Sequence, residues 1–445
     1  MTAQSSTGMV RLSGEAVIPL STLDPAGPLD DLAWLDEAIG DARVVAIGES
    51  AHYNGEFYRL RHRVLRYLAE RHGFGAYAME SGFVEGWQVD DWVRDGEAGD
   101  QEQVSRLLAN GMTSLMGLWT PMRAHLEWMR QHNLTASRPV GFYGIDLSGS
   151  NASLLPGLDA VLSYLARADP GYEVDPDVRE TASAFAAASA FSIPQALAAY
   201  GELTPERRNA LTAGLAELMA RMTGRRLDYL RRTTADAYER AVRSLSLTVA
   251  VDTVARELSA GRPDLGASIR DAAIADTVEW ILRREDRIVL AAHNGHVQRG
   301  PVTLPGMAPM TTMGMHLADR LGGDYLAIGT TSGTGRTLNP GAGFYAGELF
   351  TKMEPPQPGS LDALMDASHD GPFATDLRRL SPADTDAVRA VSAQRVGTFY
   401  ADLSPLDAYD VVIHLPHVTP ADPDHAALAH APGDVQEAFS RYKPE

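Results

Sequence analysis

Short apolar runs recur along the chain, and most of them are bounded by glycine, proline or a charged residue. Six runs have the length and the content of β-branched and aromatic residues that are typical of buried strands. These runs cover residues 44–48, 75–79, 139–145, 287–292, 325–329 and 410–414. Helical patterns occupy most of the intervals, and parallel strands require such long connections. The pattern predicts an α/β fold with a mainly parallel sheet and helices on both of its faces.

The intervals between the predicted strands differ in character. Residues 84–95 and 101–131 are predicted to be helices rich in Trp and Met. Farther along, the strand pattern disappears and helices rich in Ala, Leu and Arg take over, which predicts an inserted α-helical subdomain. The predicted organisation is an N-terminal arm (1–28), an α/β core (29–150 and 270–420), the helical insertion (151–269) and a peripheral tail (421–445).

The helix that follows the first predicted strand, residues 56–71, carries one unusual arginine. At 100° per residue its apolar side chains gather on one face. Arg61 lies within this face, one turn from both Phe57 and Leu65. A buried arginine needs a carboxylate or another anion as its partner. We weigh a core salt bridge against an arginine that points into a pocket, and we favour the pocket.

Composition narrows the possible functions. The chain has 445 residues and no cysteine, which excludes a disulfide, a thiol nucleophile and a Cys-ligated metal. Lysine occurs only at Lys352 and Lys443, which excludes a P-loop lysine. The net charge of −19 argues against a nucleic-acid partner. Because the sequence contains neither a signal-peptide pattern nor an apolar run long enough for a membrane span, we expect a cytoplasmic protein without a membrane partner.

Polar residues follow four of the predicted strands at the point where each strand ends. They are Glu49 and His52, Glu80, Asp146, and His293 and His296. The carboxyl ends of parallel strands meet at one edge of a sheet, where α/β proteins bind ligands. A single carboxylate in such a place is often a helix N-cap, and Asp146 fits that alternative equally well. The set as a whole predicts a chemical site.

Three kinds of chemistry suit this set of side chains. The first is hydrolysis, in which a His held by a carboxylate activates water and an Arg or a second His stabilises the oxyanion. The second is a metal site, formed by His293, His296 and His52 with Glu49 or Glu80; we favour it less because the spacing is not diagnostic. The third, a serine hydrolase, is disfavoured because no serine has glycine at both −2 and +2.

Several short blocks in a fixed order resemble the erythromycin esterase family. They are Gly48-Glu-Ser-Ala-His52, Glu56-Phe57, Arg61-His-Arg63, Met79-Glu80, Tyr143-Gly-Ile-Asp146, Arg270-Asp271, Ala292-His-Asn-Gly-His-Val297, and Met313-Gly314 with Leu317. The resemblance runs from about residue 30 to residue 420. No single block is specific, but the ordered set is. The resemblance implies an α/β core, an inserted helical region and a deep cleft.

The resemblance also implies an activity: hydrolysis of the lactone ester of macrolide antibiotics, without a required metal or cofactor. By motif match, His52 would be the general base that activates water, and Glu49 and Glu80 would orient the base or the water. Arg61 and His293 would hold the substrate carbonyl or the developing oxyanion. The other matched or adjacent residues are expected to bind substrate, and they are Tyr53, Asp146, Arg270, Asn294 and His296.

Two positions depart from the family pattern. The glycine that usually follows the motif histidine is replaced by Tyr53-Asn54, which places bulk beside the proposed base. The asparagine expected seven residues after Arg270 is Thr277. Both departures leave the proposed catalytic groups in place, but they bear on the choice of substrate.

Three functions therefore stay open. The first is an esterase acting on a macrolide or another large, mostly apolar cyclic ester. The second is a biosynthetic tailoring enzyme that uses the same His/Glu site for acyl transfer, elimination or cyclisation of a natural product. The third is a protein that binds a metabolite or haem. We expect a small-molecule substrate, no cofactor, and a monomer or homodimer.

Overall fold

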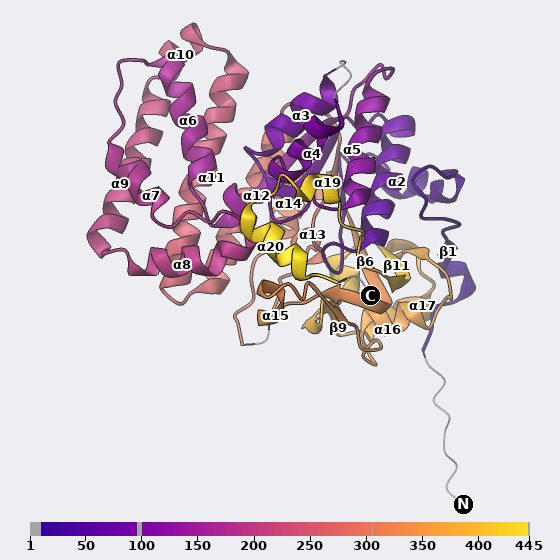
Figure 1. Ribbon diagram of the computed structural model, residues 1–445. Coiled ribbons are helices and arrows are strands. Elements are labelled where there is room, and N and C mark those ends of the chain that lie inside the picture. The colour runs from indigo at the N-terminus through magenta and orange to yellow at the C-terminus, as the bar shows by residue number, and fades with distance from the viewer. Residues whose placement is uncertain (1–9, 96–99, 305, 444–445) are drawn as a thin grey trace, which may run out of the picture. The chain divides into compact units, whose positions relative to one another are not determined.

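The computed structural model describes residues 10–95, 100–304 and 306–443, and the chain divides into two compact units (Figure 1). Unit 1 consists of the chain up to Phe74 together with Arg287–Asp422. Unit 2 consists of Gly75–Asp286 and the chain from Pro423 onward. Each unit is described by itself.

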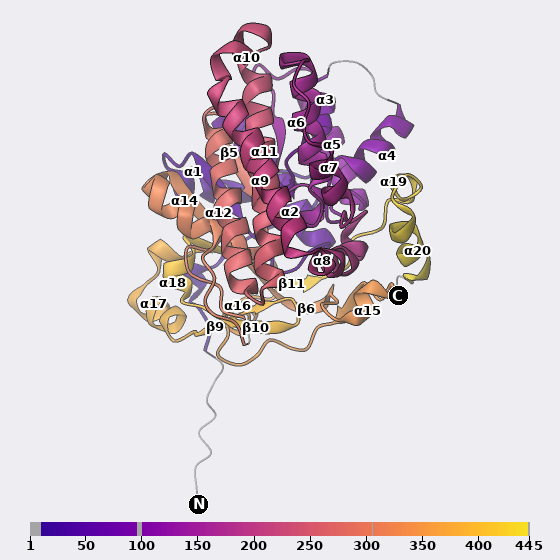
Figure 2. The same cartoon turned by 90° about the vertical axis from the view of Figure 1, so that its left-hand side faces the viewer.

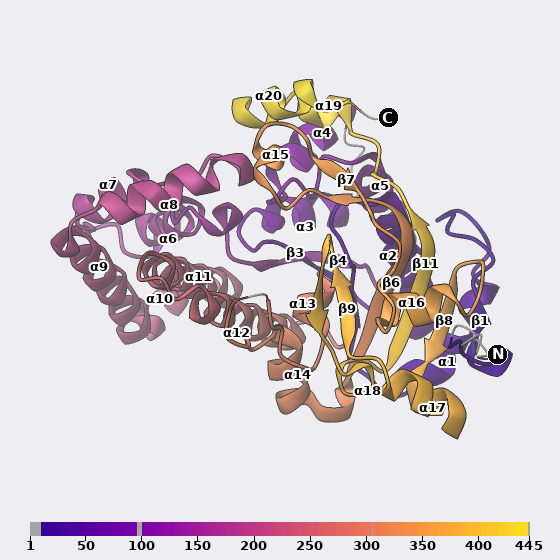
Figure 3. The same ribbon diagram turned by 90° about the horizontal axis from the view of Figure 1, so that it is seen from below.

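Four parallel strands form the centre of unit 1, in the order β11-β6-β2-β5. They are β2 (Val44–Ile47), β5 (Ile288–Ala291), β6 (Tyr325–Leu338) and β11 (Val411–Val418). Every residue of β2 and β5 is buried. This is expected for β2, because it lies between β5 and β6. Figure 3 shows β6 and β11 running side by side. Because the strands are parallel, the turn after β2 lies beside the turn after β5.

Antiparallel strands complete this sheet at its margin. β8 pairs with β11, β1 with β8, and β7 with the end of β6, while β9 and β10 form a separate hairpin. Their bounds are β1 (Ile18–Pro19), β7 (Phe350–Lys352), β8 (Phe373–Asp376), β9 (Ala393–Val396) and β10 (Phe399–Asp402). These strands are short and weakly patterned, which is why the sequence did not predict them.

The helices of unit 1 pack against this sheet, and α2 contacts both β5 and β11. They are α1 (Trp34–Ile39), α2 (Gly55–His72), α13 (Asn294–Val297), α14 (Met313–Leu321), α15 (Ala342–Tyr345), α16 (Leu361–Asp366), α17 (Pro382–Arg389) and α18 (Pro405–Ala408), with single 3₁₀ turns at Gly14–Ala16, Asp30–Leu32, Gly322–Asp324 and Leu377–Arg379. The apolar face predicted for α2 is fully buried. Phe57 packs with Met353, Leu415 and Val418 in one core cluster. The helix ends at Gly73, whose φ of 66° is a left-handed conformation that favours glycine.

Unit 2 contains one parallel strand pair and most of the helices. Its strands are β3 (Ala76–Gly82) and β4 (Gly141–Asp146), with an irregularity in register between Met79 and Gly82. Its helices are α3 (Gly86–Arg94), α4 (Gln101–Asn110), α5 (Thr120–Asn133), α6 (Leu155–Ala168), α7 (Pro176–Ser183), α8 (Ile193–Glu202), α9 (Pro205–Gly224), α10 (Arg226–Arg232), α11 (Ala235–Ser259), α12 (Pro263–Leu282), α19 (His425–Leu428) and α20 (Gly433–Arg441), with 3₁₀ turns at Gly149–Asn151 and Ala190–Ser192. α11 packs along α6, α9 and α12 (Figures 1 and 2).

The structure confirms the predicted fold class, and strands occupy all six predicted positions. It extends four of them: β3 continues past Met79 to include Glu80, β4 includes Asp146, β6 runs on to Leu338, and β11 runs on to Val418. The prediction of a continuous helix over residues 101–131 is wrong. This region is two helices, α4 and α5, separated by a loop in which Ser114 and Leu115 adopt left-handed φ. Among the described residues, none of the helices is both long enough and apolar enough to cross a membrane.

Candidate functional site

The turn that joins β2 to α2 is fixed by backbone hydrogen bonds to its neighbours. Gly48 N–H donates to the carbonyl of Ile328 at 2.8 Å, and Glu49 N–H donates to that of Ala292 at 3.1 Å. In return, Asn294 N–H donates to the carbonyl of Glu49 at 2.9 Å. These bonds continue the strand pairing by one or two residues, so they hold Glu49 rigidly against the end of β5.

Glu49 bridges an imidazole and a guanidinium. Its Oε1 lies 2.5 Å from His52 Nδ1, and its Oε2 accepts a hydrogen bond from Arg61 Nη1 at 2.7 Å. An ionised carboxylate can accept hydrogen bonds but cannot donate them, so Nδ1 of His52 carries the proton. The neutral ring of His52 therefore has its lone pair on Nε2. Glu49 is 1% exposed, whereas the His52 side chain is 23% exposed, which gives the imidazole access to solvent.

Arg61 lies in the apolar face of α2, as predicted, and is 2% exposed. Besides Glu49, its guanidinium donates to the carbonyl oxygens of Ala292 at 2.6 Å and Ile47 at 3.4 Å. The structure thus shows the buried salt bridge that we weighed against a pocket-facing arginine. This salt bridge ties α2 to the ends of β2 and β5 and holds the Glu49 carboxylate in place.

His293 stands beside His52. It is the N-cap of α13, and its ring centroid is 5.2 Å from that of His52. His293 Nδ1 accepts a hydrogen bond from Gly295 N–H at 3.1 Å, so a neutral His293 carries its proton on Nε2. The two rings are therefore complementary, because His52 offers a lone pair at Nε2 and His293 offers an N–H at Nε2. His296, one turn later in α13, is partly exposed.

The side chain of Asn294 positions this pair of histidines. It is buried, its Nδ2 donates to the carbonyl of Thr330 at 2.7 Å, and its Oδ1 accepts from Thr330 N–H at 3.1 Å. The amide thus bonds β6 in the way a neighbouring strand would. It packs directly on Gly48, where a Cβ would lie 1.9 Å from Asn294 Oδ1. Sequence reasoning missed this requirement for glycine at position 48, although a strand-ending glycine was its visible signal.

Tyr53 adopts a φ of 67°. This left-handed conformation is uncommon for an aromatic residue and costs about 1–3 kcal/mol. The turn is held by bonds on both sides, since Ala421 N–H donates to the Tyr53 carbonyl at 2.8 Å and Asn54 Nδ2 donates to the carbonyl of Arg336 at 2.7 Å. Tyr53 is buried, and its ring centroid is 5.6 Å from that of His52.

A second group of predicted residues lies in unit 2. Arg270 of α12 forms a two-point salt bridge with Asp146, with Nε at 2.9 Å from Oδ1 and Nη2 at 2.5 Å from Oδ2. Arg270 Nη2 also lies 3.1 Å from Glu80 Oε1. Burial alone would lower the pKa of the Arg270 guanidinium, but the charges of Asp146 and Glu80 outweigh it and raise that pKa. The arginine therefore stays charged.

The predicted residues thus form two groups, one in each unit. Glu49, His52, Arg61 and His293 come together in unit 1, with Tyr53, Asn294 and His296 adjoining them. Glu80, Asp146 and Arg270 come together in unit 2. Within the described ranges, no three His, Cys, Asp or Glu side chains are grouped so as to hold a metal ion.

Comparison with known proteins places these motifs in context. A family model described as erythromycin esterase matches residues 69–418. Erythromycin esterase type II from Escherichia coli is 30% identical over 332 residues, which cover 72% of this chain and 76% of that protein. Erythromycin esterase type I from Escherichia coli is 27% identical over 308 residues, covering 67% and 71%. A solved structure of a mutant erythromycin esterase, EreC, in its open conformation shares the fold, with a TM-score of 0.72, 21% identity, and coverage of 90% of this chain and 97% of that chain.

Proposed function

Because the chain belongs to the erythromycin esterase family and is thus a carboxylic ester hydrolase, we propose that it adds water across the lactone of a macrolide or a similar large cyclic ester. The observation that carries this proposal is the Glu49–His52 pair, with the Nδ1–H of the imidazole directed at a buried carboxylate. This arrangement makes Nε2 the basic atom of His52, which is what activation of water requires.

In the proposed reaction His52 Nε2 removes a proton from water, and the hydroxide so formed attacks the lactone carbonyl. Glu49 holds the ring and stabilises the imidazolium that results. The Nε2–H of His293 donates to the oxyanion of the tetrahedral intermediate. When the intermediate collapses, the ester C–O bond breaks and the leaving alkoxide takes the proton from His52. The products are a carboxylic acid and an alcohol on one opened ring, one water heavier than the substrate.

The supporting residues have graded roles in this proposal. Arg61 is a positioning residue, since its guanidinium bonds Glu49 and backbone carbonyls. Family resemblance assigns Glu80 to orienting the base or the water, and it assigns Asp146 and Arg270 to substrate binding. Tyr53, Asn294 and His296 adjoin the histidine pair; Tyr53 and His296 would shape the substrate pocket, and the geometry of Asn294 supports positioning.

The proposal includes metal independence, because each proton and charge in the scheme is handled by a side chain of the chain itself. We also propose that the substrate is a large and mostly apolar ester, and that the protein is a monomer or homodimer in the cytoplasm.

A mass-spectrometric assay tests the proposed activity. Metal-stripped protein is incubated with a panel of macrolides, and the products are weighed. We expect the mass of one water to be gained with the wild type and with His425→Gln, an exposed histidine that serves as the matched control. We expect no gain with His52→Gln, because glutamine cannot accept the proton from water.

Full activity of His52→Gln would show that His52 is not the general base. Activity that returns only when a divalent metal is restored would overturn metal independence. If no macrolide gains a water with the wild type, the substrate is a different cyclic ester, and the biosynthetic alternative then takes precedence.

A further inference from the structure

The β9–β10 hairpin of unit 1 is joined by its tip to the turn that carries the proposed base. Residues 397 and 398 form a two-residue turn, since the residues on either side of them pair. Gly397 has a φ of 60°, whereas Thr398 is not among the described residues with positive φ, which is the pattern of a type II′ turn. The first central N–H makes no bond within such a turn. Here Gly397 N–H donates to the carbonyl of Ser50 at 3.1 Å.

Ser50 lies between the two residues of the proposed catalytic pair, Glu49 and His52, and is 1% exposed. Its carbonyl oxygen accepts the hydrogen bond from the hairpin, and its hydroxyl oxygen lies 3.1 Å from that of Ser332 in β6. The backbone and the side chain of Ser50 are therefore both held. A shift of the hairpin tip would move the segment that leads to His52.

A second contact of the hairpin leads to the other histidine. Gln394 of β9 is buried, and its Nε2 donates to the carbonyl of Thr330 at 2.9 Å. The same carbonyl accepts a hydrogen bond from Nδ2 of Asn294 at 2.7 Å, so two amides share one acceptor. The Tyr409 hydroxyl donates to Oε1 of Gln394 at 2.8 Å, which fixes the end of the amide that faces Thr330. Because Asn294 directly follows His293, the N-cap of α13, this network reaches the proposed oxyanion donor.

Two buried charged groups anchor the hairpin within unit 1. Arg395 N–H donates to Asp362 Oδ2 at 2.8 Å, and Oδ1 of the same carboxylate accepts a hydrogen bond from Ser332 N–H at 3.2 Å. The Arg395 guanidinium donates to the carbonyl of Gly333 at 3.1 Å and to the hydroxyl of Tyr400 at 2.8 Å. Asp362 is 0% exposed and Arg395 is 3% exposed. Buried polar networks of this kind fix one arrangement of their members, so the position of the hairpin is well defined.

The hairpin owes its position to these contacts and not to the main sheet. It forms a two-stranded sheet of its own. Two-stranded hairpins are at best marginally stable by themselves, so the buried contacts decide where its tip lies. The contacts lead to the segments of both His52 and His293, whose ring centroids are 5.2 Å apart.

From these contacts we infer that the β9–β10 hairpin sets the separation of the two histidine rings. Gly397 is a positioning residue for His52. Gln394 is a positioning residue for His293. The catalytic meaning of the separation rests on the proposed function, in which one ring takes a proton from water and the other donates to the oxyanion. The separation itself is measured without a substrate.

The nuclear Overhauser effect between the two rings tests this inference in the full chain. The protein is deuterated except for its histidine rings, and the two rings are assigned with His52→Gln and His293→Gln. The cross-peak between them weakens steeply as the rings move apart. We expect Gln394→Met to weaken it about twofold or more, because methionine has a similar length but makes neither hydrogen bond of the amide.

Variants of the hairpin tip separate the hydrogen bond from the turn. Gly397→Pro removes the donor to Ser50, because proline has no N–H, and should weaken the cross-peak to a similar extent. In the double variant Gly397→Asn with Thr398→Gly, the turn becomes type I′, in which the first central residue also has positive φ. Because this variant keeps the N–H, its cross-peak should have the wild-type intensity.

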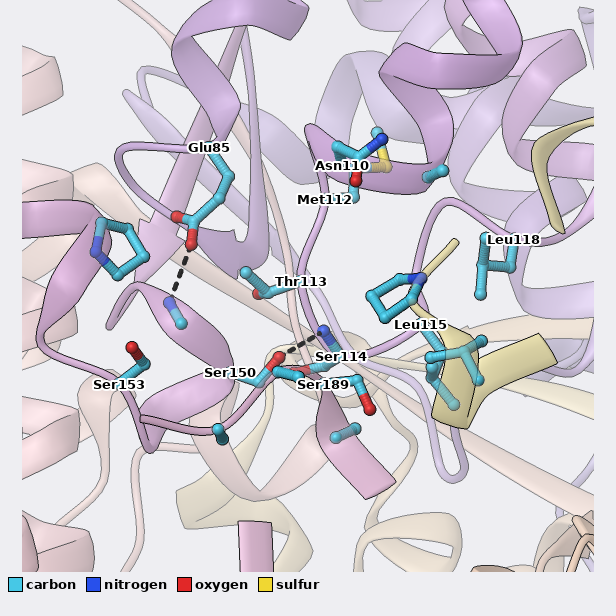
Figure 4. A pocket seen from close by; sticks show the side chains of 18 residues that line it. Glu85, Asn110, Met112, Thr113, Ser114, Leu115, Leu118, Ser150, Ser153 and Ser189 are labelled. Atoms are coloured by element: carbon cyan, nitrogen blue, oxygen red, sulfur yellow. Dashed lines mark hydrogen bonds between the residues drawn. The ribbon is translucent and has the colours of Figure 1, made fainter. Parts of the chain in front are cut away.

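A matched control removes a buried hydrogen bond from unit 2. Ser150→Ala deletes the acceptor of Ser114 N–H, which donates to Ser150 Oγ at 3.2 Å (Figure 4). This variant loses one buried hydrogen bond without touching the hairpin, so the ring cross-peak should be unchanged.

Steady-state kinetics with an ester that the wild type hydrolyses gives a second readout. Per folded molecule, Gln394→Met should lower kcat about tenfold, because misplacing a catalytic group by about 1 Å can cost about 100-fold. KM should stay within about twofold, because the change alters the placement of the histidines and not a contact with bound substrate. Circular dichroism measures the folded fraction.

No ring cross-peak in the wild type, or wild-type intensity in both Gln394→Met and Gly397→Pro, would overturn the inference. So would an equal loss in Ser150→Ala, because ring separation would then follow general stability. A weak cross-peak in the double variant would overturn the role of the Gly397 N–H. If the cross-peak responds as expected but the wild type hydrolyses no ester, the proposed function fails and the inference stands. Hydrolysis with a cross-peak that no variant changes would overturn the inference alone.

Discussion

Glu49 is the residue on which the proposed chemistry depends most. One buried carboxylate orients His52 through Oε1 and neutralises Arg61 through Oε2. Removing two charges from water costs several kcal/mol per ion, and only a close, fully hydrogen-bonded pair offsets that cost. The loss of either partner therefore affects both stability and catalysis.

Replacing Glu49 tests both effects. We expect Glu49→Gln to lower kcat by about 10³-fold or more, because a neutral amide stabilises the imidazolium poorly and no longer selects the Nδ1–H tautomer. We also expect a loss of about 3–5 kcal/mol in the free energy of unfolding, because the buried Arg61 loses its counter-charge. Steady-state kinetics and urea unfolding measure the two quantities.

Glu70→Gln, on the exposed side of the same helix, is the matched control and should change neither quantity. Arg61→Ala should reproduce the loss of stability. If Glu49→Gln retained most of the wild-type kcat, the carboxylate would not be orienting the base.

For single residues, the sequence predicted that Arg61 needs an anionic partner, but it did not identify that partner. Arg61 stood out because a charged residue interrupted the apolar face of a helix, and a buried arginine requires an anion. That its partner is Glu49, and that Ala292 and Ile47 supply carbonyl oxygens, depends on how α2 lies against the strand ends. No local pattern encodes those contacts.

Among the elements, the short helix α13 brings His293 to His52, and the Asn294–Thr330 hydrogen bonds fix where it starts. The amide occupies the space that a side chain at position 48 would need. Gly48 and Asn294, which are far apart in sequence, therefore form one packing unit.

A double-mutant cycle tests this unit. We expect Gly48→Ala to destabilise the protein by about 1–3 kcal/mol, because the new Cβ overlaps Asn294 Oδ1. Asn294→Ala should cost about 1–3 kcal/mol by removing the acceptor of the buried Thr330 N–H, whereas the Thr330 carbonyl still accepts a hydrogen bond from Gln394 Nε2. The double variant should be less destabilised than the sum of the two, since removing the amide makes room for the methyl group.

Gly323→Ala is the matched control, because a Cβ there meets no atom within 4 Å. Strict additivity of the two changes, measured by denaturant unfolding, would show that the close approach at Gly48 does not restrict the turn.

The elements also show where sequence patterns lose resolution. Periodicity correctly predicted α2 and six strands of the sheet, but not its short antiparallel strands. It also predicted one helix over 101–131, where the structure has α4, a loop and α5. The loop is apolar because Met112, Leu115 and Leu118 are buried in the core of unit 2. A buried loop has the same composition as the buried face of a helix.

For the molecule as a whole, the burial of titratable groups ties stability to pH. His62 in α2 is 4% exposed, and burial, together with the charge of Arg66, lowers its pKa from 6.5 to about 4. At pH values between these two pKa values, His62 binds a proton in the unfolded chain but not in the folded protein. The contribution of neutral His62 is therefore complete above pH 6.5 and is lost as the pH falls toward 4.

We expect this group to remove up to about 3 kcal/mol from the free energy of unfolding across that interval. In His62→Leu, the free energy of unfolding should fall by that much less between pH 6.5 and pH 4. The exposed control His425→Leu should behave like the wild type. Urea unfolding at a series of pH values measures both. Parallel curves for His62→Leu and wild type between pH 4 and 6.5 would show that His62 is protonated in the folded state.

Much of this protein was determined by its sequence alone. The six strand positions, the α/β class with a mainly parallel sheet, the buried face of α2 and membership of the erythromycin esterase family were all predicted and are confirmed. The strands, the fold class and the helix face are local features that side-chain periodicity records directly. Family membership was indicated instead by the ordered set of sequence blocks.

Tertiary structure decided the rest. The hydrogen-bond partners of His52 and His293, the packing of Asn294 on Gly48 and the division into two units all depend on how segments of the chain pack together. Hydrophobic periodicity shows which side of an element is buried, but not which residue it meets there. That choice is made only when the whole core packs, because the energy of each such contact depends on its neighbours.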